Sequence, residues 1–211
     1  MNYNFMMKKQ TWSKAGAIVA ITLLCTSAGI AVAASAPADP PAGGTLQQRV
    51  DQRKQEQAIT LSANDQKRIV SNCVLSQAKV RAVQTATVNT VASYTKVYGV
   101  IDANLWGIVG QLKLAGKDTY VLEKDHLDFV AKVAAFQATA TNYQQSLDDT
   151  VLMNCSADPV GFESLVFTAR AYYAQLRSEA DGINDNVVNV IKPELSAHTT
   201  DLQSKAASGG N

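Results

Sequence analysis

Residues 158–193 read DPVGFESLVFTARAYYAQLRSEADGINDNVVNVIKP, and this stretch determines the fold we expect. Its apolar residues recur at alternating steps of three and four: Phe162, Val166, Ala169, Tyr173, Leu176, Ala180, Ile183, Val187 and Val190. Such spacing indicates one apolar face of an α-helix with coiled-coil-like packing. Asp158 followed by Pro159 is a favourable helix start, because proline is pre-set for the first helical position. Pro193 is expected to kink or end the helix.

Two earlier stretches, residues 70–115 and 122–147, carry the same apolar repeat. The β-branched residues between Val80 and Ile101 favour strands on propensity, but the helical repeat passes through them unbroken. We therefore expect helix throughout both stretches.

Residues at the ends of these stretches are typical of helix caps. Ser62 and Asp65 resemble a capping box that opens the first helix. Gly116 suits the left-handed position that closes it, and Asp118 or Thr119 can cap the next helix. The short loop at Gly116 makes the neighbouring helices antiparallel. The sequence thus predicts an all-α fold, an up-down-up bundle of three long antiparallel helices with coiled-coil-like packing.

A charged, glutamine-rich segment, residues 45–57, precedes this bundle. Leu46 and Val50 are its main apolar residues, so we expect a weak, mobile N-terminal helix. Its charged residues are interpreted as a solvated helix face: Arg49, Asp51, Arg53, Lys54 and Glu56.

The N-terminus has the order of a secretory signal peptide. Residues 1–14 contain three lysines and no acid, and residues 15–34 are uncharged and mostly apolar and end in small residues. We expect cleavage after Ala33 or Ala34 and an extracytoplasmic location, periplasmic or secreted. The alternative is an uncleaved membrane anchor at residues 15–34. The expected parts are a signal peptide at 1–34, a flexible linker at 35–44, the helical domain at 45–202 and a disordered tail at 203–211.

Cys73 and Cys155 are the two cysteines that remain without the leader. Counted outward from the turn at Lys117, they lie 44 and 38 residues away. In an antiparallel hairpin their levels differ by six residues, or about 9 Å of helix, which a short non-helical stretch can bridge. Because an exported chain meets oxidising conditions, we predict one structural disulfide. Two separate buried thiols are the alternative.

The charge of the chain argues against one class of partner. It holds 19 basic and 18 acidic residues, and three of the lysines lie in the leader, so the mature part is weakly acidic. Without a basic run we expect no nucleic-acid binding. The sequence motifs of metalloproteases, P-loop proteins, serine hydrolases and dinucleotide-binding enzymes do not occur. We therefore expect no enzymatic activity and no cofactor.

Two groups of residues are candidate sites. Glu123 and His126 form a Glu-x-x-His pair, which is half of a carboxylate-bridged di-metal site, although a core histidine is the alternative. Trp106, with Gly107 and Gly110 beside it, is a candidate partner contact, because tryptophan is favoured at interfaces and small residues allow close approach. The alternative, which we favour from sequence, is that the third helix covers this face.

The residues around the last helix resemble those of known proteins. The stretch 158–170, with Cys155 before it and residues 191–193 after it, is similar to an uncharacterised family of exported all-helical bacterial proteins. That resemblance covers most of the mature chain and implies no activity, ligand or catalytic residue. Residues 61–66, LSANDQ, also resemble the Leu-Thr-x-x-Gln motif of the small periplasmic stress chaperones, with Ser62 in place of the threonine and Asp65 in place of the glutamine.

These observations together predict an exported, non-enzymatic helical protein. We expect a structural or interaction module of the cell envelope or extracellular space, whose partner is another protein or an envelope component. It would contact a membrane only if the N-terminal segment stays uncleaved. A periplasmic chaperone-like binder of unfolded proteins and a metal-binding helical bundle are the alternatives.

Overall fold

The computed structural model describes residues 44–208, and the side chains of residues 44–200 within them. This part of the chain is all-helical, as expected, with no strand in residues 44–208. The expected signal peptide and almost all of the expected linker lie outside it. No helix within residues 44–208 is long and apolar enough to cross a membrane.

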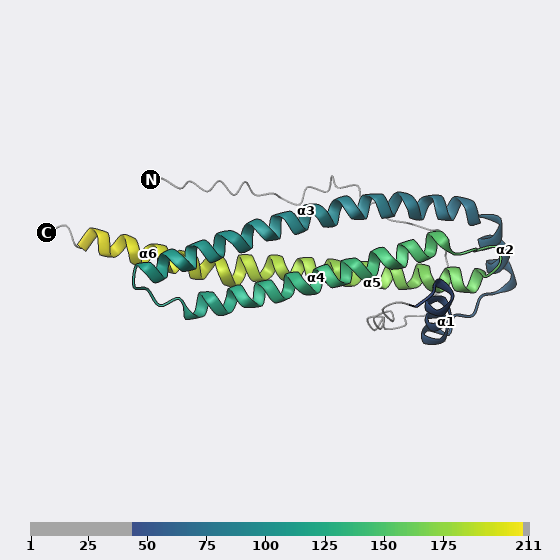
Figure 1. Cartoon of the computed structure of the whole chain (residues 1–211), viewed down its shortest axis with the longest axis horizontal. Helices are drawn as coiled ribbons and strands as arrows, with labels where there is room; N and C mark the ends of the chain where they lie inside the picture. The colour runs from purple at the N-terminus through teal and green to yellow at the C-terminus, as the bar shows by residue number, and fades with distance from the viewer. Residues whose placement is uncertain (1–43, 209–211) are drawn as a thin grey trace. The chain divides into compact units, whose positions relative to one another are not determined.

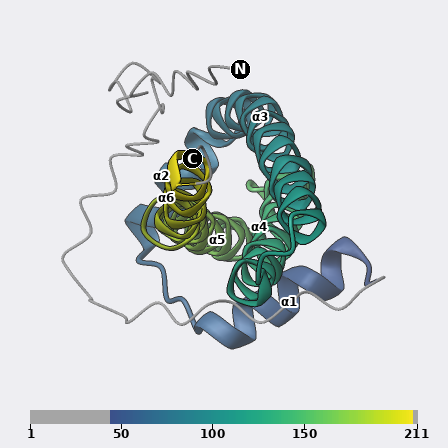
Figure 2. The same cartoon turned by 90° about the vertical axis from the view of Figure 1, so that its left-hand side faces the viewer.

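Three long helices lie alongside one another (Figure 1). Short helices α1 and α2 precede them, and a π-helical turn, η1, and helix α6 follow. The bounds are α1 Leu46–Gln57, α2 Ala63–Ser71, α3 Cys73–Leu114, α4 Tyr120–Leu152, α5 Pro159–Asn186, η1 Val187–Ile191 and α6 Lys192–Ser208. Viewed along the long helices, α4 lies between α3 and α5, and α1 crosses one end (Figure 2).

The turn between α3 and α4 closes as the sequence predicts. Gly116 has a φ of 68°, and the N–H of Lys117 donates to the carbonyl of Leu112 at 3.0 Å. This bond satisfies a carbonyl that the end of α3 would otherwise leave unpaired. Thr119 is the N-cap residue of α4, and Asp118 before it accepts a hydrogen bond from the N–H of Tyr120 at 3.0 Å. The chain therefore reverses within a few residues, and α4 runs back beside α3.

The start of the last long helix is also confirmed. The carboxylate of Asp158 accepts a hydrogen bond from the N–H of Gly161 at 2.8 Å, and Pro159 occupies the first helical position. Proline costs nothing there, because its missing N–H would have no partner within the helix.

Pro193 does not end the helical path. The chain widens into the π-helical turn Val187–Ile191, where the N–H of Lys192 donates to the carbonyl of Val187, and α6 then begins at Lys192. A π-turn directly before a proline supplies the local adjustment that an uninterrupted α-helix cannot. Helix α6 runs to Ser208, beyond the expected domain end at residue 202.

The expected first long helix is divided in two at Asn72. Ser62 caps α2 by accepting from the N–H of Asp65 at 3.2 Å, but α2 ends at Ser71. Asn72 has φ −106° and ψ 12°, and its side-chain amide donates to the carbonyl of Arg68 at 2.9 Å. An asparagine side chain that binds the backbone in this way competes with helix propagation.

Apolar side chains form two clusters. The larger cluster follows the seam between α3, α4 and α5, where Tyr98 meets the rings of Phe129 and Phe136 edge-on at centroid distances of 6.4 and 5.4 Å. The smaller cluster lies at the end that holds the disulfide. Its buried residues are Val50, Cys73, Met153, Cys155, Phe162, Leu165 and Val166.

Helix α1 packs on the bundle. The prediction that its charges are solvated is confirmed for Asp51 and Glu56, which are exposed, and is wrong for Arg53, which is buried, and for Arg49, which is mostly buried. Val50 is fully buried, and Arg53 is 3% exposed. Arg49 pairs with Asp149 at 2.6 Å, and the Asp149 side chain is itself buried. Arg49 and Lys54 of this short polar helix therefore pair with carboxylates of distant segments, those of Asp149 and Asp158.

The start of α1 carries a signal that the sequence analysis missed. Thr45 and Gln48 form a capping box, in which the Thr45 hydroxyl accepts from the N–H of Gln48 and the Gln48 side chain accepts from the N–H of Thr45. A box of this kind stabilises a helix start by pairing two otherwise unpaired N–H groups.

Candidate interaction surface

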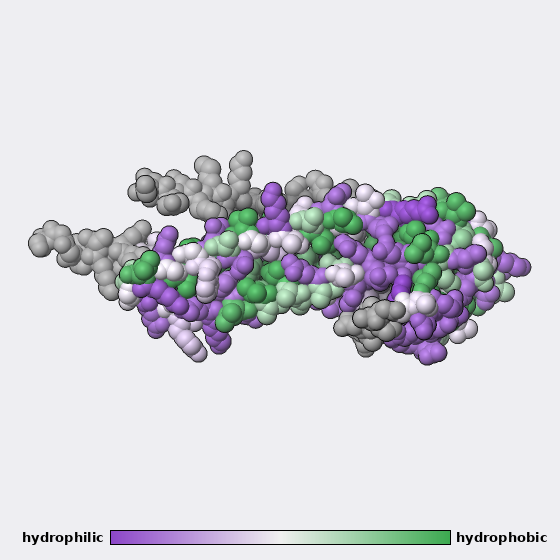
Figure 3. All heavy atoms as spheres, viewed as in Figure 1, coloured by the Kyte–Doolittle hydropathy of each residue, from purple (hydrophilic) through white to green (hydrophobic). Residues whose placement is uncertain are grey.

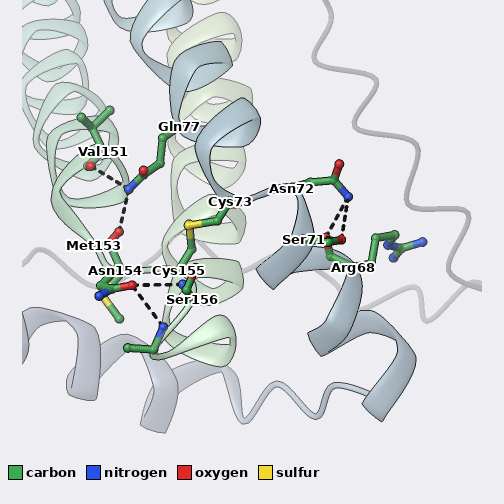
Figure 4. The surroundings of a disulfide bond; sticks show 11 residues. Arg68, Ser71, Asn72, Cys73, Gln77, Val151, Met153, Asn154, Cys155 and Ser156 are labelled. Carbon is green, nitrogen blue, oxygen red and sulfur yellow. Dashed lines mark hydrogen bonds between the residues drawn. A yellow bond between two sulfur atoms is a disulfide. The ribbon is translucent and has the colours of Figure 1, made fainter.

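The disulfide between Cys73 and Cys155 is present, as predicted (Figure 4). Their Cα atoms lie 5.6 Å apart although 82 residues separate them in sequence. Gln77 reinforces this corner, because its side-chain amide donates to the carbonyls of Val151 and Met153 at 3.0 and 2.7 Å. The start of α3 is thus fixed to the segment between α4 and α5. A disulfide of this kind fits an oxidising compartment.

The outward side of α3 is poor in charge. Between Arg81 and Lys113 the helix contains two charged residues, Lys96 and Asp102. A soluble helix usually covers its solvent side with many charged residues. On α3, apolar side chains are exposed where charged ones would be usual. They are Val88, Val97, Val100 and Trp106.

Trp106 stands on this uncovered side, so the expectation that the third helix covers it is wrong. Trp106 is 60% exposed, and its ring contacts that of His126 at a centroid distance of 5.5 Å. Gly107 and Gly110 face open space, since a Cβ added at either would meet no atom within 4 Å. All three candidate contact residues are therefore accessible to a partner.

Helix α4 extends the exposed apolar surface across the turn. Leu114 at the end of α3 is 91% exposed, and four residues in the first part of α4 are exposed beside it. Figure 3 shows hydrophobic residues reaching the surface in patches on the face viewed there. We call the following set the α3–α4 outer surface: Val88, Val97, Val100, Trp106, Leu114, Tyr120, Val121, Leu127 and Val130.

The outward side of α5 has the opposite character. Arg170, Arg177, Asp181 and Asp185 are exposed along it, with Phe167 as its exposed large apolar residue. The solvent-facing side of α5 is therefore mostly charged, whereas that of α3 is poor in charge. Exposed large apolar side chains are more numerous on α3 and α4 than on α5.

Glu123 and His126 interact with different residues of α3 and of the turn between α3 and α4. His126 is buried, and its Nε2 lies 2.6 Å from an oxygen of Asp102. Glu123 accepts hydrogen bonds from Thr119 and Lys113, which lower the pKa of its carboxyl group. Within residues 44–208, no group of three or more His, Cys, Asp and Glu side chains is placed to hold a metal ion. The pair links α4 to its neighbour instead.

Comparison with protein-family models, curated proteins and solved structures finds no match to this chain. Both resemblances seen in the sequence therefore stay predictions. Of the residues that carry the second one, Ser62 caps α2, and the Gln66 side chain donates to the carbonyl of Leu61 at 3.3 Å. A local structural role accounts for both side chains.

Proposed function

We propose that this protein is an exported, non-enzymatic interaction module that binds another macromolecule through the α3–α4 outer surface. One observation carries the proposal: α3 and the start of α4 expose large apolar side chains, and α3 carries only two charged residues between Arg81 and Lys113. Exposed apolar patches on a protein surface are candidate sites of interaction. The partner would be another protein or an envelope component.

The remainder of the molecule serves, in this proposal, as a support for that surface. We infer that α3, α4 and α5 form an up-down-up bundle with coiled-coil-like packing, in keeping with the 3.5-residue repeat of buried residues. The disulfide and docked α1 hold one end of this bundle. A binding surface on rigid helices loses little conformational entropy when a partner arrives.

We place this module in the periplasm or outside the cell. The signal-like residues 1–34 and the disulfide support this location. If residues 15–34 stay attached, the helical domain is tethered to the membrane by its N-terminus.

Site-specific photo-cross-linking in living cells tests the proposal. A photoreactive residue replaces Ala103 on the outward side of α3 or, as the matched control, Ala174 on α5; both alanines are exposed. We expect Ala103 to give discrete cross-linked products and Ala174 to give few. Equal yields from the two positions, or no products from Ala103, would argue against a binding surface on α3.

Chaperone-like binding of unfolded proteins is the second candidate, because exposed apolar side chains also suit that role. The purified protein would then suppress the aggregation of several unrelated unfolded proteins. Val97→Glu with Val100→Glu should abolish that suppression, since both valines are exposed and their removal leaves the seam intact. A saturable cross-link to one partner species would instead favour the interaction module.

A further inference from the structure

A hollow of about 250 Å³ lies in the groove between α4 and α5, which run side by side (Figure 1). Lys132 and Ala135 line it from α4, and Glu179 and Gly182 line it from α5. We infer that this hollow binds a small organic molecule that carries a primary ammonium group, with the Glu179 carboxylate as its acceptor. The site is separate from the α3–α4 outer surface, so the inference goes beyond the proposed function and does not depend on it.

Two hydrogen-bonded bridges between the helices bracket the hollow. At one end, the side-chain amide of Asn186 donates to Asp128 at 3.0 Å. At the other end, the side-chain amide of Gln175 donates to the hydroxyl of Thr139 at 3.1 Å. The lining residues lie between these bridges on both helices. Two fixed contacts therefore hold the walls of the hollow in place.

Gly182 leaves this space open. A Cβ added to it would meet no atom within 4 Å, and its φ is not positive, so neither crowding nor backbone conformation requires glycine there. Glycine inside a helix lowers helix stability relative to alanine. The small residue at this position therefore has no role in packing, and its effect is to widen the groove beside Glu179.

Glu179 supplies a carboxylate whose hydrogen bonding is incomplete. Its Oε1 accepts from the Thr139 hydroxyl and from the Gln175 amide, both at 2.9 Å. Its Oε2 is buried and has no hydrogen-bond partner within residues 44–208. A buried carboxylate oxygen without a donor is unfavourable, and an N–H group of a ligand would remove that cost. The last torsion of a glutamate side chain is soft, so Oε2 can turn toward the hollow.

The charges around the hollow favour a cation. Asp128 and Glu179 are acidic and Lys132 is basic, which leaves one negative charge in excess. Lys132 pairs with Asp128 rather than with Glu179, with its Nζ 3.2 Å from a carboxylate oxygen. The Glu179 carboxylate is therefore left for a cation from outside the chain.

The wall of the hollow selects a small ligand with an apolar part. Ala135 and Gly182 bring no polar side-chain group, and the stem of Lys132 is apolar as well. Sites for drug-sized ligands measure about 300–1,000 Å³, so this hollow of about 250 Å³ suits a smaller molecule. A short alkyl chain against these residues would place its ammonium group at Glu179. A quaternary ammonium has no N–H and cannot complete the hydrogen bonding of Oε2.

Titration with n-butylammonium tests the site, followed by NMR of the backbone amides in the full chain with its disulfide formed. We expect saturable shifts centred on Ala135 and Gly182. Tetramethylammonium is the matched control, because it carries the same charge without an N–H, and it should bind at least about tenfold more weakly. Equal binding of the two ions would overturn the assigned recognition. The absence of saturable shifts with n-butylammonium would overturn the site itself.

Matched variants locate the bound ion. Glu179→Gln should weaken n-butylammonium binding about tenfold or more, whereas Asp185→Asn removes an exposed carboxylate of the same helix and should change it less than about twofold. Gly182→Leu should fill the hollow and abolish binding. Thermal unfolding checks that each variant folds, and Ala135→Leu narrows the hollow from α4 in case Gly182→Leu does not fold. Binding that survives the loss of the carboxylate or the filling of the hollow overturns the inference.

Discussion

The two ends of the long helices differ in the long-range contacts that hold them. At the disulfide end, α1 packs on the start of α5, the disulfide ties α3 to the segment before α5, and Val50, Cys155 and Phe162 are buried. At the turn end, the loop at Gly116 joins α3 to α4. Apolar side chains are exposed at both ends, among them Val74 and Leu152 at the disulfide end and Leu114 and Tyr120 at the turn end. The apolar repeat is similar in both places, so the difference comes from what packs outside the seam.

In this account the disulfide end stabilises the fold, and the α3–α4 outer surface binds the partner. Residues far from each other in sequence fix the disulfide end, through the disulfide and through the Arg49–Asp149 pair. The disulfide does not reach the α3–α4 outer surface, and the α3 part of that surface carries two charged residues between Arg81 and Lys113, Lys96 and Asp102. Binding surfaces are often drawn from the parts of a protein that its own folding leaves uncovered.

Removal of the disulfide should have the largest effect on stability and should act mainly at the disulfide end. Cys73→Ser with Cys155→Ser frees a loop of about 80 residues, so the free energy of unfolding should fall by at most about 4–5 kcal/mol. Hydrogen exchange should become faster in α1, α2 and the start of α5, while the turn at Gly116 changes little. Equal acceleration at both ends would show that the ends are not separately stabilised.

Loss of the buried Arg49–Asp149 ion pair should have the second-largest effect on the free energy of unfolding. Asp149→Ala leaves the Arg49 guanidinium without its partner in a mostly buried position, at a cost of about 3 kcal/mol. Urea unfolding measures the change. Lys132→Ala is the control, because it removes an exposed ion pair with Asp128 and should cost no more than about 0.5 kcal/mol. Similar losses for the two variants would contradict a special role for the α1 contact.

Glycine-to-alanine substitutions should have opposite signs at the two ends. A Cβ at Gly161 would lie 2.5 Å from a carboxylate oxygen of Asp158 and 2.8 Å from methyl carbons of Val50 and Met153. Gly161→Ala should therefore destabilise the protein by about 1–3 kcal/mol and loosen α1. Gly107→Ala should stabilise it by about 0.5–1 kcal/mol, because the site is open and alanine favours helix. Thermal unfolding of both variants decides the matter.

Alkaline pH should act at the seam between the two ends. Burial, with lesser contributions from Tyr94 and Asp181, raises the pKa of Tyr98 to about 12. An unfolded tyrosine loses its proton near pH 10, so the unfolded chain ionises first and stability should fall as pH rises from about 10 to about 12. Tyr98→Phe should flatten that part of the stability profile. An unchanged profile would mean that Tyr98 is not shielded from water.

The sequence predicted those features that depend on local signals. The helical repeat, the left-handed Gly116 and the Asp158–Pro159 start each depend on a few neighbouring residues. The disulfide followed from the same information, because the hairpin turn sets which residues lie at one level. These predictions needed no knowledge of distant contacts.

The features that were missed depend on distant segments. The sequence predicted that the charges of α1 are solvated, because Asp149, the partner of Arg49, is 100 residues away. Helical periodicity placed Trp106 outside the seam but did not show which neighbour would cover it. The break at Asn72 depends on a side-chain hydrogen bond to Arg68, which competes with a helical repeat that is otherwise continuous.

The exposure of Trp106 in its native compartment tests the central claim most directly. It is the sole tryptophan of residues 44–208, so radical footprinting of its ring reports on one place in the α3–α4 outer surface. We expect rapid labelling in the dilute purified protein and labelling several-fold slower in the native compartment, where a partner covers the ring. Equal labelling in both settings would contradict a binding role for this surface.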